Sequence, residues 1–301
     1  MRHKPVLIKE VIENIDLKDG DTYLDLTLGS AGHSQAVCSL GLKNLTIIGL
    51  DKDIEAIERS GKYLENCKAK IILENSPNNL LDEVLSKHGI EGVDAILIDL
   101  GISSEQLDIS GRGFTFQRDE PLLMTMKKDL TDSDLTARII VNTFAEESLA
   151  DIIYGFGEER YSRRIAKGIV EARQEKEIKT TFDLVDIIKN STPKRYHHLK
   201  SHPATRTFQA LRMVVNEEYQ TLTITLNKAF NYLNPGAKLL VISFHSIEDR
   251  IVKKWIREKH DQGLGVRVNK KPLAPTREEV LDNPRSRSSK LRIIQKNEQE
   301  H

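Results

Sequence analysis

The stretch Asp25-Leu-Thr-Leu-Gly-Ser-Ala-Gly-His-Ser34 decides the fold that the sequence predicts. A short apolar strand over residues 21–27 runs into a turn of small residues at 29–32, and a helical pattern begins near His33. Glycines between a strand and a helix allow backbone N–H groups to come close to a ligand. In an α/β domain such a turn is the usual place for a nucleotide-like cofactor. We therefore expect a cofactor site here, with NAD as one open alternative.

The first hundred residues alternate between short apolar runs and amphipathic helical stretches, which predicts βαβ units and a parallel sheet. The expected strands lie at 22–27, 45–50, 70–73 and 93–100, and the expected helices at 32–40, 53–64 and 78–88. Two further strands are expected at 237–244, after the breaker Asn234-Pro-Gly236, and at 291–295, with an amphipathic helix from Ser246 between them.

The middle of the chain differs, because residues 131–192 are highly charged and show only helical spacing of apolar residues. This pattern predicts a helical insertion between the fourth and fifth strands. Its entrance is the glycine-rich loop from Gly101 to Gly113, and its exit is the run from His202 into the next helix.

Composition bounds the class of protein. The chain has 301 residues, 39% hydrophobic and 30% charged, which is typical of a soluble globular protein of one large or two smaller domains. No apolar run reaches the roughly 20 residues of a membrane span, and no signal peptide is expected. Two isolated cysteines, Cys38 and Cys67, lack Cys-x-x-Cys spacing, which favours a reducing cytoplasm and argues against a zinc site; no metal is expected.

Local charge is more informative than global charge, because Lys plus Arg equals Asp plus Glu at 45 each. Basic residues gather between Arg267 and Arg292, and again between Lys194 and Arg206. A charge run alone is most often solvated surface. Beside a catalytic site, the same residues could hold the phosphates of a nucleic acid.

Acidic residues end the second and fourth expected strands. Asp51 lies 22 residues after Gly29, where a carboxylate can accept both ribose hydroxyls, although it could equally cap the next helix. Asp99 would point into the crevice at the carboxyl ends of the strands, unless it only caps a loop. The turn Gly-Ser-Ala-Gly is not Gly-x-Gly-x-x-Gly, and Asp99 stands where S-adenosylmethionine-dependent enzymes place their reacting end, so this cofactor is favoured over NAD.

Motifs from residue 99 onward resemble those of a known family of enzymes. The chain resembles the bacterial 16S rRNA cytosine-N4 methyltransferases of the RsmH (MraW) type over nearly its whole length. After the opening turn, the matching stretches are Asp99-Leu-Gly-Ile-Ser-Ser-Glu-Gln-Leu-Asp108, Arg112-Gly-Phe-Thr-Phe-Gln-Arg-Asp119, Tyr154-Gly-Phe-Gly-Glu-Glu-Arg160, His202-Pro-Ala-Thr-Arg-Thr-Phe-Gln-Ala-Leu-Arg212, Ser243-Phe-His-Ser-Ile-Glu-Asp-Arg250 and Asn283-Pro-Arg-Ser-Arg-Ser-Ser-Lys-Leu-Arg292.

The resemblance implies a class I S-adenosylmethionine-dependent methyltransferase, an α/β fold with a Rossmann-like sheet and an inserted all-helical domain. Its core would be residues 1–110 and 210–301, and residues 111–209 would recognise the substrate, a cytidine in the decoding centre of small-subunit rRNA. The implied cofactor contacts are Ala31, Gly32, His33, Asp51, Asp99 and Gln106.

The chain departs from the family at three places: Pro77 stands where an aromatic residue usually faces the adenine, Leu123 and Thr125 replace an acidic and a basic residue, and Glu105 stands where the family favours proline.

For the reaction we expect Asp99 to accept a hydrogen of the attacking amine. His245 is a candidate proton acceptor, or else only a hydrogen-bonded structural residue. The expected RNA contacts are Lys194, Arg195, Arg206, Arg285 and Arg287. Two alternatives stay open: a methyltransferase for another RNA, a protein or a small molecule, and a non-catalytic RNA-binding relative. The sequence leaves the choice between monomer and homodimer open.

Overall fold

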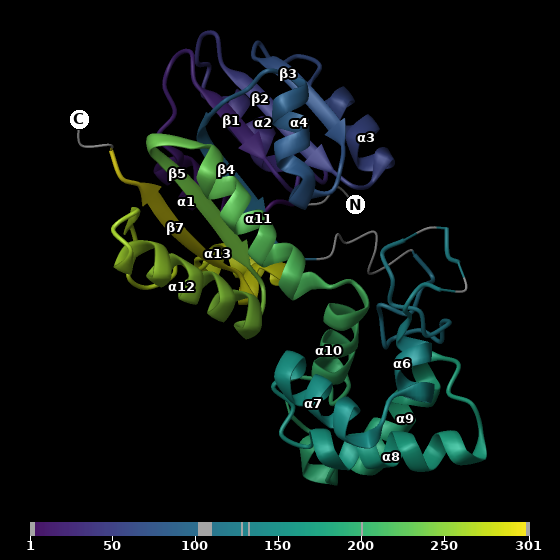
Figure 1. Cartoon of the computed structure of the whole chain (residues 1–301). Coiled ribbons are helices and arrows are strands. Elements are labelled where there is room, and N and C mark those ends of the chain that lie inside the picture. The colour runs from purple at the N-terminus through teal and green to yellow at the C-terminus, as the bar shows by residue number, and fades with distance from the viewer. Residues whose placement is uncertain (1–3, 102–109, 128, 132, 200, 299–301) are drawn as a thin grey trace. The chain divides into compact units, whose positions relative to one another are not determined.

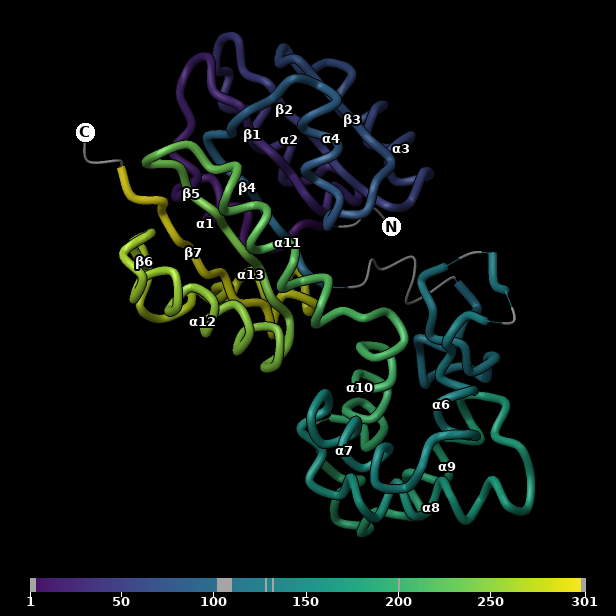
Figure 2. Tube along the Cα trace, in the orientation of Figure 1, coloured from purple at the N-terminus to yellow at the C-terminus, as the bar shows by residue number. Residues whose placement is uncertain are grey.

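A computed structural model describes residues 4–101, 110–127, 129–131, 133–199 and 201–298. The chain divides into two compact units (Figures 1 and 2). The first unit joins Met1–Gly101 with Gln220–His301, and the second is Ile102–Tyr219. The substrate-recognition role expected for residues 111–209 stays a prediction.

The first unit is built on a seven-stranded sheet in the order β3-β2-β1-β4-β5-β7-β6. Its strands are β1 (Thr22–Asp25), β2 (Thr46–Asp51), β3 (Lys70–Asn75), β4 (Val93–Asp99), β5 (Leu233–Ser243), β6 (Gly265–Arg267) and β7 (Lys290–Lys296). Strands β1 to β5 pair in parallel, whereas β7 runs antiparallel to both β5 and β6. The order reverses between β1 and β4, so the crevice at the carboxyl ends of these strands is where an open sheet binds ligands.

Both faces of the sheet are covered, because alternate residues of strands β1 to β5 and β7 enter two separate cores. In β4, for example, Ile96 and Ile98 enter one core, and Ala95 and Leu97 enter the other. Helices α4 (Leu81–Lys87), α11 (Glu218–Tyr232) and α12 (Ser246–Asp261) cover the first face. Helices α1 (Ile8–Ile15), α2 (Gly32–Cys38) and α3 (Ile54–Leu64) cover the second. The short helix α13 (Arg277–Asp282) and the 3₁₀ turns Asn78–Leu80 and Pro284–Ser288 complete the unit.

Several elements differ from the expectation. Helices α1, α11 and α13 and strand β6 were not expected; β6 has only three residues, too few for a periodic pattern. Strand β5 begins at Leu233, before the breaker Asn234-Pro-Gly236 rather than after it. The pairing with β4 shifts here, from Val93 opposite Leu233 to Ala95 opposite Lys238, so the strand absorbs the breaker as an irregularity.

In the described part of the second unit, five helices lie around their own apolar core: α6 (Ala137–Thr143), α7 (Glu146–Gly157), α8 (Ser162–Glu175), α9 (Thr181–Ser191) and α10 (Thr205–Val215). The 3₁₀ turn Lys194–Tyr196 follows α9. Two glycines let these helices approach closely: a Cβ at Gly157 would lie 2.5 Å from the carbonyl oxygen of Arg206, and one at Gly168 would lie 2.2 Å from the hydroxyl of Ser191. In the described part of the chain, no helix combines the length and apolarity needed to cross a membrane.

The two cysteines are not isolated thiols, contrary to the expectation. Cys38 ends α2, Cys67 follows α3, and a disulfide joins them with their Cα atoms 5.8 Å apart. The two helices lie side by side, and the amide of Gln35 in α2 donates to the carbonyl of Tyr63 in α3 at 2.8 Å. Because 29 residues separate the cysteines, only the packing of these helices reveals the pair.

Candidate cofactor and methyl-transfer site

Three acidic residues end three neighbouring parallel strands: Asp51 on β2, Asp25 on β1 and Asp99 on β4. Each has the parity of residues that enter the core on the α2 side of the sheet, such as Tyr23 and Leu97. The three carboxylates therefore gather at one edge and on one face of the sheet. The start of α2 lies on that face.

The turn between β1 and α2 is held in an unusual backbone conformation. Ala31, fully buried, precedes α2 with φ of 54°, a left-handed value that is rare outside glycine, and Gly29 has φ of 52°. Strained residues of this kind cluster at ligand sites. The Asp51 carboxylate fastens the turn, because its Oδ2 accepts the N–H of Gly29 at 2.8 Å and its Oδ1 accepts that of Asp53 at 2.9 Å.

The alternative role considered for Asp51, a cap of the next helix, belongs to Asp53 instead. The carboxylate of Asp53 accepts the N–H of Glu55 at 3.1 Å and begins α3. Burial is the main cause of a raised pKa at Asp51, and the two backbone hydrogen bonds oppose it. Its remaining lone pairs could accept ribose hydroxyls.

Gly32 is required by packing. A Cβ at this position would lie 2.6 Å from Cγ of Pro5, so the N-terminal segment closes over the start of α2. An open pocket of about 460 Å³ borders the turn here, with Lys4, Ile8, Ser30 and Gln35 among its lining residues. None of the three strand-end carboxylates lines it, so this pocket is distinct from the carboxylate cluster.

Asp99 and His33 carry buried polar atoms that have no hydrogen-bond partner in the described part of the chain. Within the described residues, Asp99 Oδ1 and both ring nitrogens of His33 are buried and accept or donate no hydrogen bond. His33 Nε2 lies 3.7 Å from Asp99 Oδ2, and the backbone N–H of Asp99 donates to the Thr27 hydroxyl at 2.6 Å. Buried polar groups are normally paired, so orphaned ones indicate a place for a polar ligand. An acceptor at Asp99 and a donor–acceptor ring at His33 fit the amine and hydroxyl groups of S-adenosylmethionine.

Asp25 is a site residue that the sequence reasoning missed. It is only 2% exposed, its Oδ2 accepts the hydroxyl of Ser34 at 2.8 Å, and its Oδ1 accepts the N–H of Thr27 at 3.1 Å. Burial, more than any neighbouring charge, raises the pKa of Asp25 from 3.8 to about 6. The signal was its position at the end of β1, the same signal that singled out Asp51 and Asp99.

This raised pKa predicts a pH dependence of stability. The folded chain favours the protonated Asp25, so the stabilisation is present below about pH 4 and is lost as the pH rises to about 6. The loss is on the order of 3 kcal/mol. We expect Asp25→Asn to lack this component, so the variant should gain stability relative to the parent between pH 4 and pH 7. Urea unfolding of both proteins across this range tests it; parallel profiles would contradict the prediction.

His245 begins α12 as its N-cap. Its Nδ1 accepts the N–H of Glu248 at 3.4 Å, and its Nε2 lies 3.1 Å from Glu248 Oε1. The Glu248 carboxylate in turn accepts the N–H of Phe244 at 2.9 Å. These contacts suit the structural alternative for His245, and its role as a proton acceptor stays a prediction.

The expected RNA contacts lie in both units. Arg285 and Arg287 are exposed on the 3₁₀ turn Pro284–Ser288 of the first unit. In the second unit, Lys194 and Arg195 belong to the turn that ends at Tyr196, and Arg206 lies in α10. Gln106, the last expected cofactor contact, lies outside the described residues.

Tyr196 lies close to basic residues of the second unit. Arg160 lies 5.2 Å from the centre of the Tyr196 ring, and the phenol donates a hydrogen bond to the fully buried Glu159. Burial and this bond raise the pKa of Tyr196 to about 12, although the charges of Arg206 and Arg160 oppose the shift. Arg160 thus adds a further cation close to the turn Lys194–Tyr196.

The sheet order, the single antiparallel strand β7 and the carboxylates at the ends of β2 and β4 define a class I methyltransferase, whose cofactor is S-adenosylmethionine. The chain belongs to the MraW methylase family, whose model matches residues 1–297.

Curated relatives match the whole chain. It is 44% identical to the ribosomal RNA small subunit methyltransferase H of Acetivibrio thermocellus, covering 98% of this chain and 99% of that protein. The protein of the same name from a Sulfurihydrogenibium species is 43% identical, covering 97% and 98%. Among solved structures, an rRNA methylase from Streptococcus thermophilus is similar with a TM-score of 0.46 and 11% identity, covering 99% of each chain.

Proposed function

We propose that this chain is a small-subunit rRNA methyltransferase that transfers a methyl group to the N4 amine of a cytidine in the decoding centre. The names of relatives at 38–44% identity over the whole chain support the rRNA substrate. The observation that carries the N4 reaction is the buried, unpartnered Oδ1 of Asp99 at the end of β4. We infer a cytoplasmic location from the ribosomal substrate; in a reducing compartment Cys38 and Cys67 would be thiols.

The reaction requires that the amine be positioned against the methyl group and that a protein group accept the amine proton. Bound S-adenosylmethionine supplies an electrophilic methyl group. The N4 lone pair is delocalised into the cytosine ring, so the protein must hold the amine at near-attack distance and in line. As the new N–C bond forms at the expense of the methyl–sulfur bond, an N–H proton becomes acidic, and the Asp99 carboxylate would accept that proton. Asp51 and His33 would orient the cofactor from the neighbouring strand end and helix start.

Cysteine chemistry is not needed for this reaction. Methylation at cytosine C5 uses a thiol nucleophile, and the chain has only Cys38 and Cys67. Cys38 ends α2 and Cys67 follows α3. Neither belongs to the carboxylate cluster, which favours direct attack by N4 over a covalent route.

Deletion of the gene tests the proposal. Small-subunit rRNA from the deletion strain should lack one N4-methylcytidine by mass spectrometry, and the parent gene should restore it. A gene carrying Asp99→Ala should not restore the mark. An unchanged N4-methylcytidine signal in the deletion strain would refute the proposed substrate, and a lost mark on another base would refute the N4 position.

A further inference from the structure

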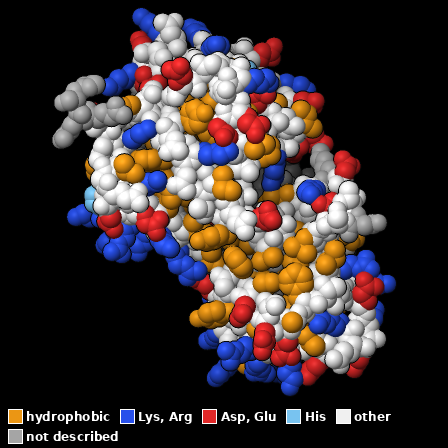
Figure 3. Space-filling model, in the orientation of Figure 1, with side chains coloured by type: hydrophobic (Ala, Val, Ile, Leu, Met, Phe, Trp, Pro, Cys, Tyr) orange, Lys and Arg blue, Asp and Glu red, His pale blue; other side chains and the backbone are white. Residues whose placement is uncertain are grey.

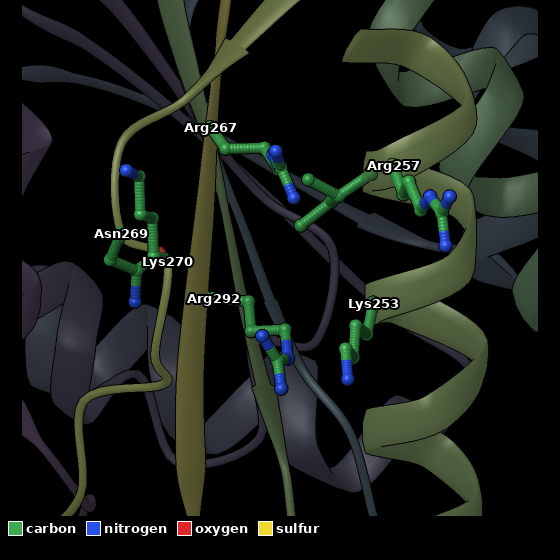
Figure 4. Close-up of a pocket in the computed structure, with 7 residues that line it drawn as sticks. Lys253, Arg257, Arg267, Asn269, Lys270 and Arg292 are labelled. Atoms are coloured by element: carbon green, nitrogen blue, oxygen red, sulfur yellow. The ribbon is translucent and has the colours of Figure 1, made fainter. Parts of the chain in front are cut away.

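A small basic pocket lies in the first unit between α12 and the strands β6 and β7. Its lining is Lys253, Ile256, Arg257, Arg267, Asn269, Lys270 and Arg292, with five cations and no acidic residue. Figure 4 shows Lys253 and Arg292 entering the space between α12 and β7, with Arg267 directed toward the helix. Lys and Arg side chains also gather at the edge of the molecule near α12 (Figure 3).

The charges of this pocket are only partly neutralised. Arg257 pairs with Asp261 at 3.4 Å, and Arg292 pairs with Asp249. Lys253, Arg267 and Lys270 are exposed, and none has an ion-pair partner within the part of the chain that the structure describes. In a chain whose net charge is zero, three uncompensated cations around one hollow create a local positive potential.

The floor and the wall of the pocket are held in place before any ligand arrives. Arg292 is 8% exposed, and its Nε donates to Asp249 Oδ1 at 2.6 Å while its second guanidinium nitrogen donates to Oδ2 at 3.3 Å. Asn269 fixes the loop after β6, because its amide donates to the carbonyl of Leu291 at 2.9 Å and its oxygen accepts the N–H of Ile293 at 2.9 Å. A fixed arrangement of donors loses little conformational entropy on binding.

The size of the pocket limits its ligand. Its volume is about 40 Å³, room for a few water molecules. A nucleobase or a cofactor does not fit, but a single phosphate group with its remaining oxygens in solvent does. Phosphate is also the anion that arginine and lysine bind most readily in nucleic acids.

We propose that this pocket binds one backbone phosphate of the RNA substrate. The inference rests on the proposed function and adds a second contact surface to the first unit. Arg292 pairs opposite Val241 of β5, and β7 lies two strand spacings, about 10 Å, from β4. Arg292 contacts Asp249 of α12, so the pocket lies on the α12 face of the sheet, whereas Asp99 has the parity of the α2 face. An RNA strand that reaches both would pass around the edge of the sheet, so the bound phosphate would anchor a segment of the RNA away from the reacting nucleotide.

Neutralising the three uncompensated cations tests the pocket. Lys253→Gln, Arg267→Gln and Lys270→Gln together should weaken binding to purified small ribosomal subunits by tenfold or more. They should reduce the slope of log K against log salt by about 1, as expected for one lost phosphate contact. Binding of S-adenosylmethionine, measured by calorimetry, should not change.

A matched triple variant controls for charge. Lys254→Gln, Lys271→Gln and Arg277→Gln remove the same charge from nearby exposed positions that do not line the pocket. We expect less than a threefold loss of affinity and an unchanged salt slope. Equal losses of affinity in the two triple variants would overturn the proposed phosphate site, because the loss would then follow from the reduced positive charge of the protein as a whole. Tight binding of pyrophosphate in the pocket, with RNA binding unaffected by the substitutions, would overturn it as well.

The readouts separate this inference from the proposed function. If the parent methylates rRNA and the pocket variant binds the subunit normally, the pocket is refuted and the function stands. If the parent binds small subunits through the pocket yet leaves no N4-methyl mark, the proposed reaction fails and the phosphate site stands. The double variant Arg285→Gln, Arg287→Gln is tested in parallel. If these two arginines bind RNA independently of the pocket, their loss of binding free energy should add to that of the pocket variant.

Discussion

Asp99→Ala should reduce methyl transfer on the order of 100- to 10,000-fold, the range typical of a lost proton acceptor. The substitution removes the buried Oδ1 that has no partner in the described part of the chain. Because this atom is desolvated without a hydrogen bond, its loss should change the free energy of unfolding by less than about 1 kcal/mol. Single-turnover kinetics on small subunits from the deletion strain measure the first effect, and urea unfolding measures the second.

A second aspartate on the same strand provides the matched control. Asp94, near the start of β4, accepts the N–H of Thr22 at 2.8 Å and the amide of Asn234 at 2.7 Å. Asp94→Ala should destabilise the fold by about 1–3 kcal/mol and leave the rate of methyl transfer unchanged. Asp99→Ala should thus lower the rate with little effect on stability, and Asp94→Ala should lower the stability with no effect on the rate. Full activity of Asp99→Ala would remove this carboxylate from the mechanism.

The site could be anticipated where it depends on periodicity. Residues at the ends of neighbouring parallel strands must meet at one edge, so the positions of Asp51 and Asp99 followed from the strand pattern. Asp25 obeys the same rule. Its distinguishing property, a pKa raised to about 6, comes from complete burial, which the residue type does not reveal.

What escaped prediction depends on contacts between distant segments. The Arg292–Asp249 pair joins a strand to a helix 43 residues away, and the Cys38–Cys67 disulfide spans 29 residues. The basic run from Arg267 to Arg292 was visible in the sequence. The structure divides this run into two places. Arg267 and Arg292 line the pocket, and Arg285 and Arg287 lie on a separate turn. This division depends on how β6 and β7 pair.

Asp51→Ala should weaken binding of S-adenosylmethionine by roughly 10- to 150-fold, equivalent to the 1.5–3 kcal/mol of a charge-assisted hydrogen bond. At saturating cofactor the rate of methyl transfer should fall much less, because we propose that Asp51 binds the ribose, away from the reacting methyl. Calorimetry and kinetics separate the two effects. A fall in rate at saturation as large as that for Asp99→Ala would contradict this assignment.

The difficulty is that Asp51 also fastens the turn, through Gly29 and Asp53. A double-mutant cycle separates the two roles by using S-adenosylhomocysteine and its analogue without ribose hydroxyls. If the carboxylate binds those hydroxyls, the parent should prefer the natural ligand strongly and Asp51→Ala should hardly distinguish the two. If it only fastens the turn, both ligands should lose affinity equally. Asp53→Ala, which removes the cap of α3, should cost about 1 kcal/mol of stability and leave the preference intact.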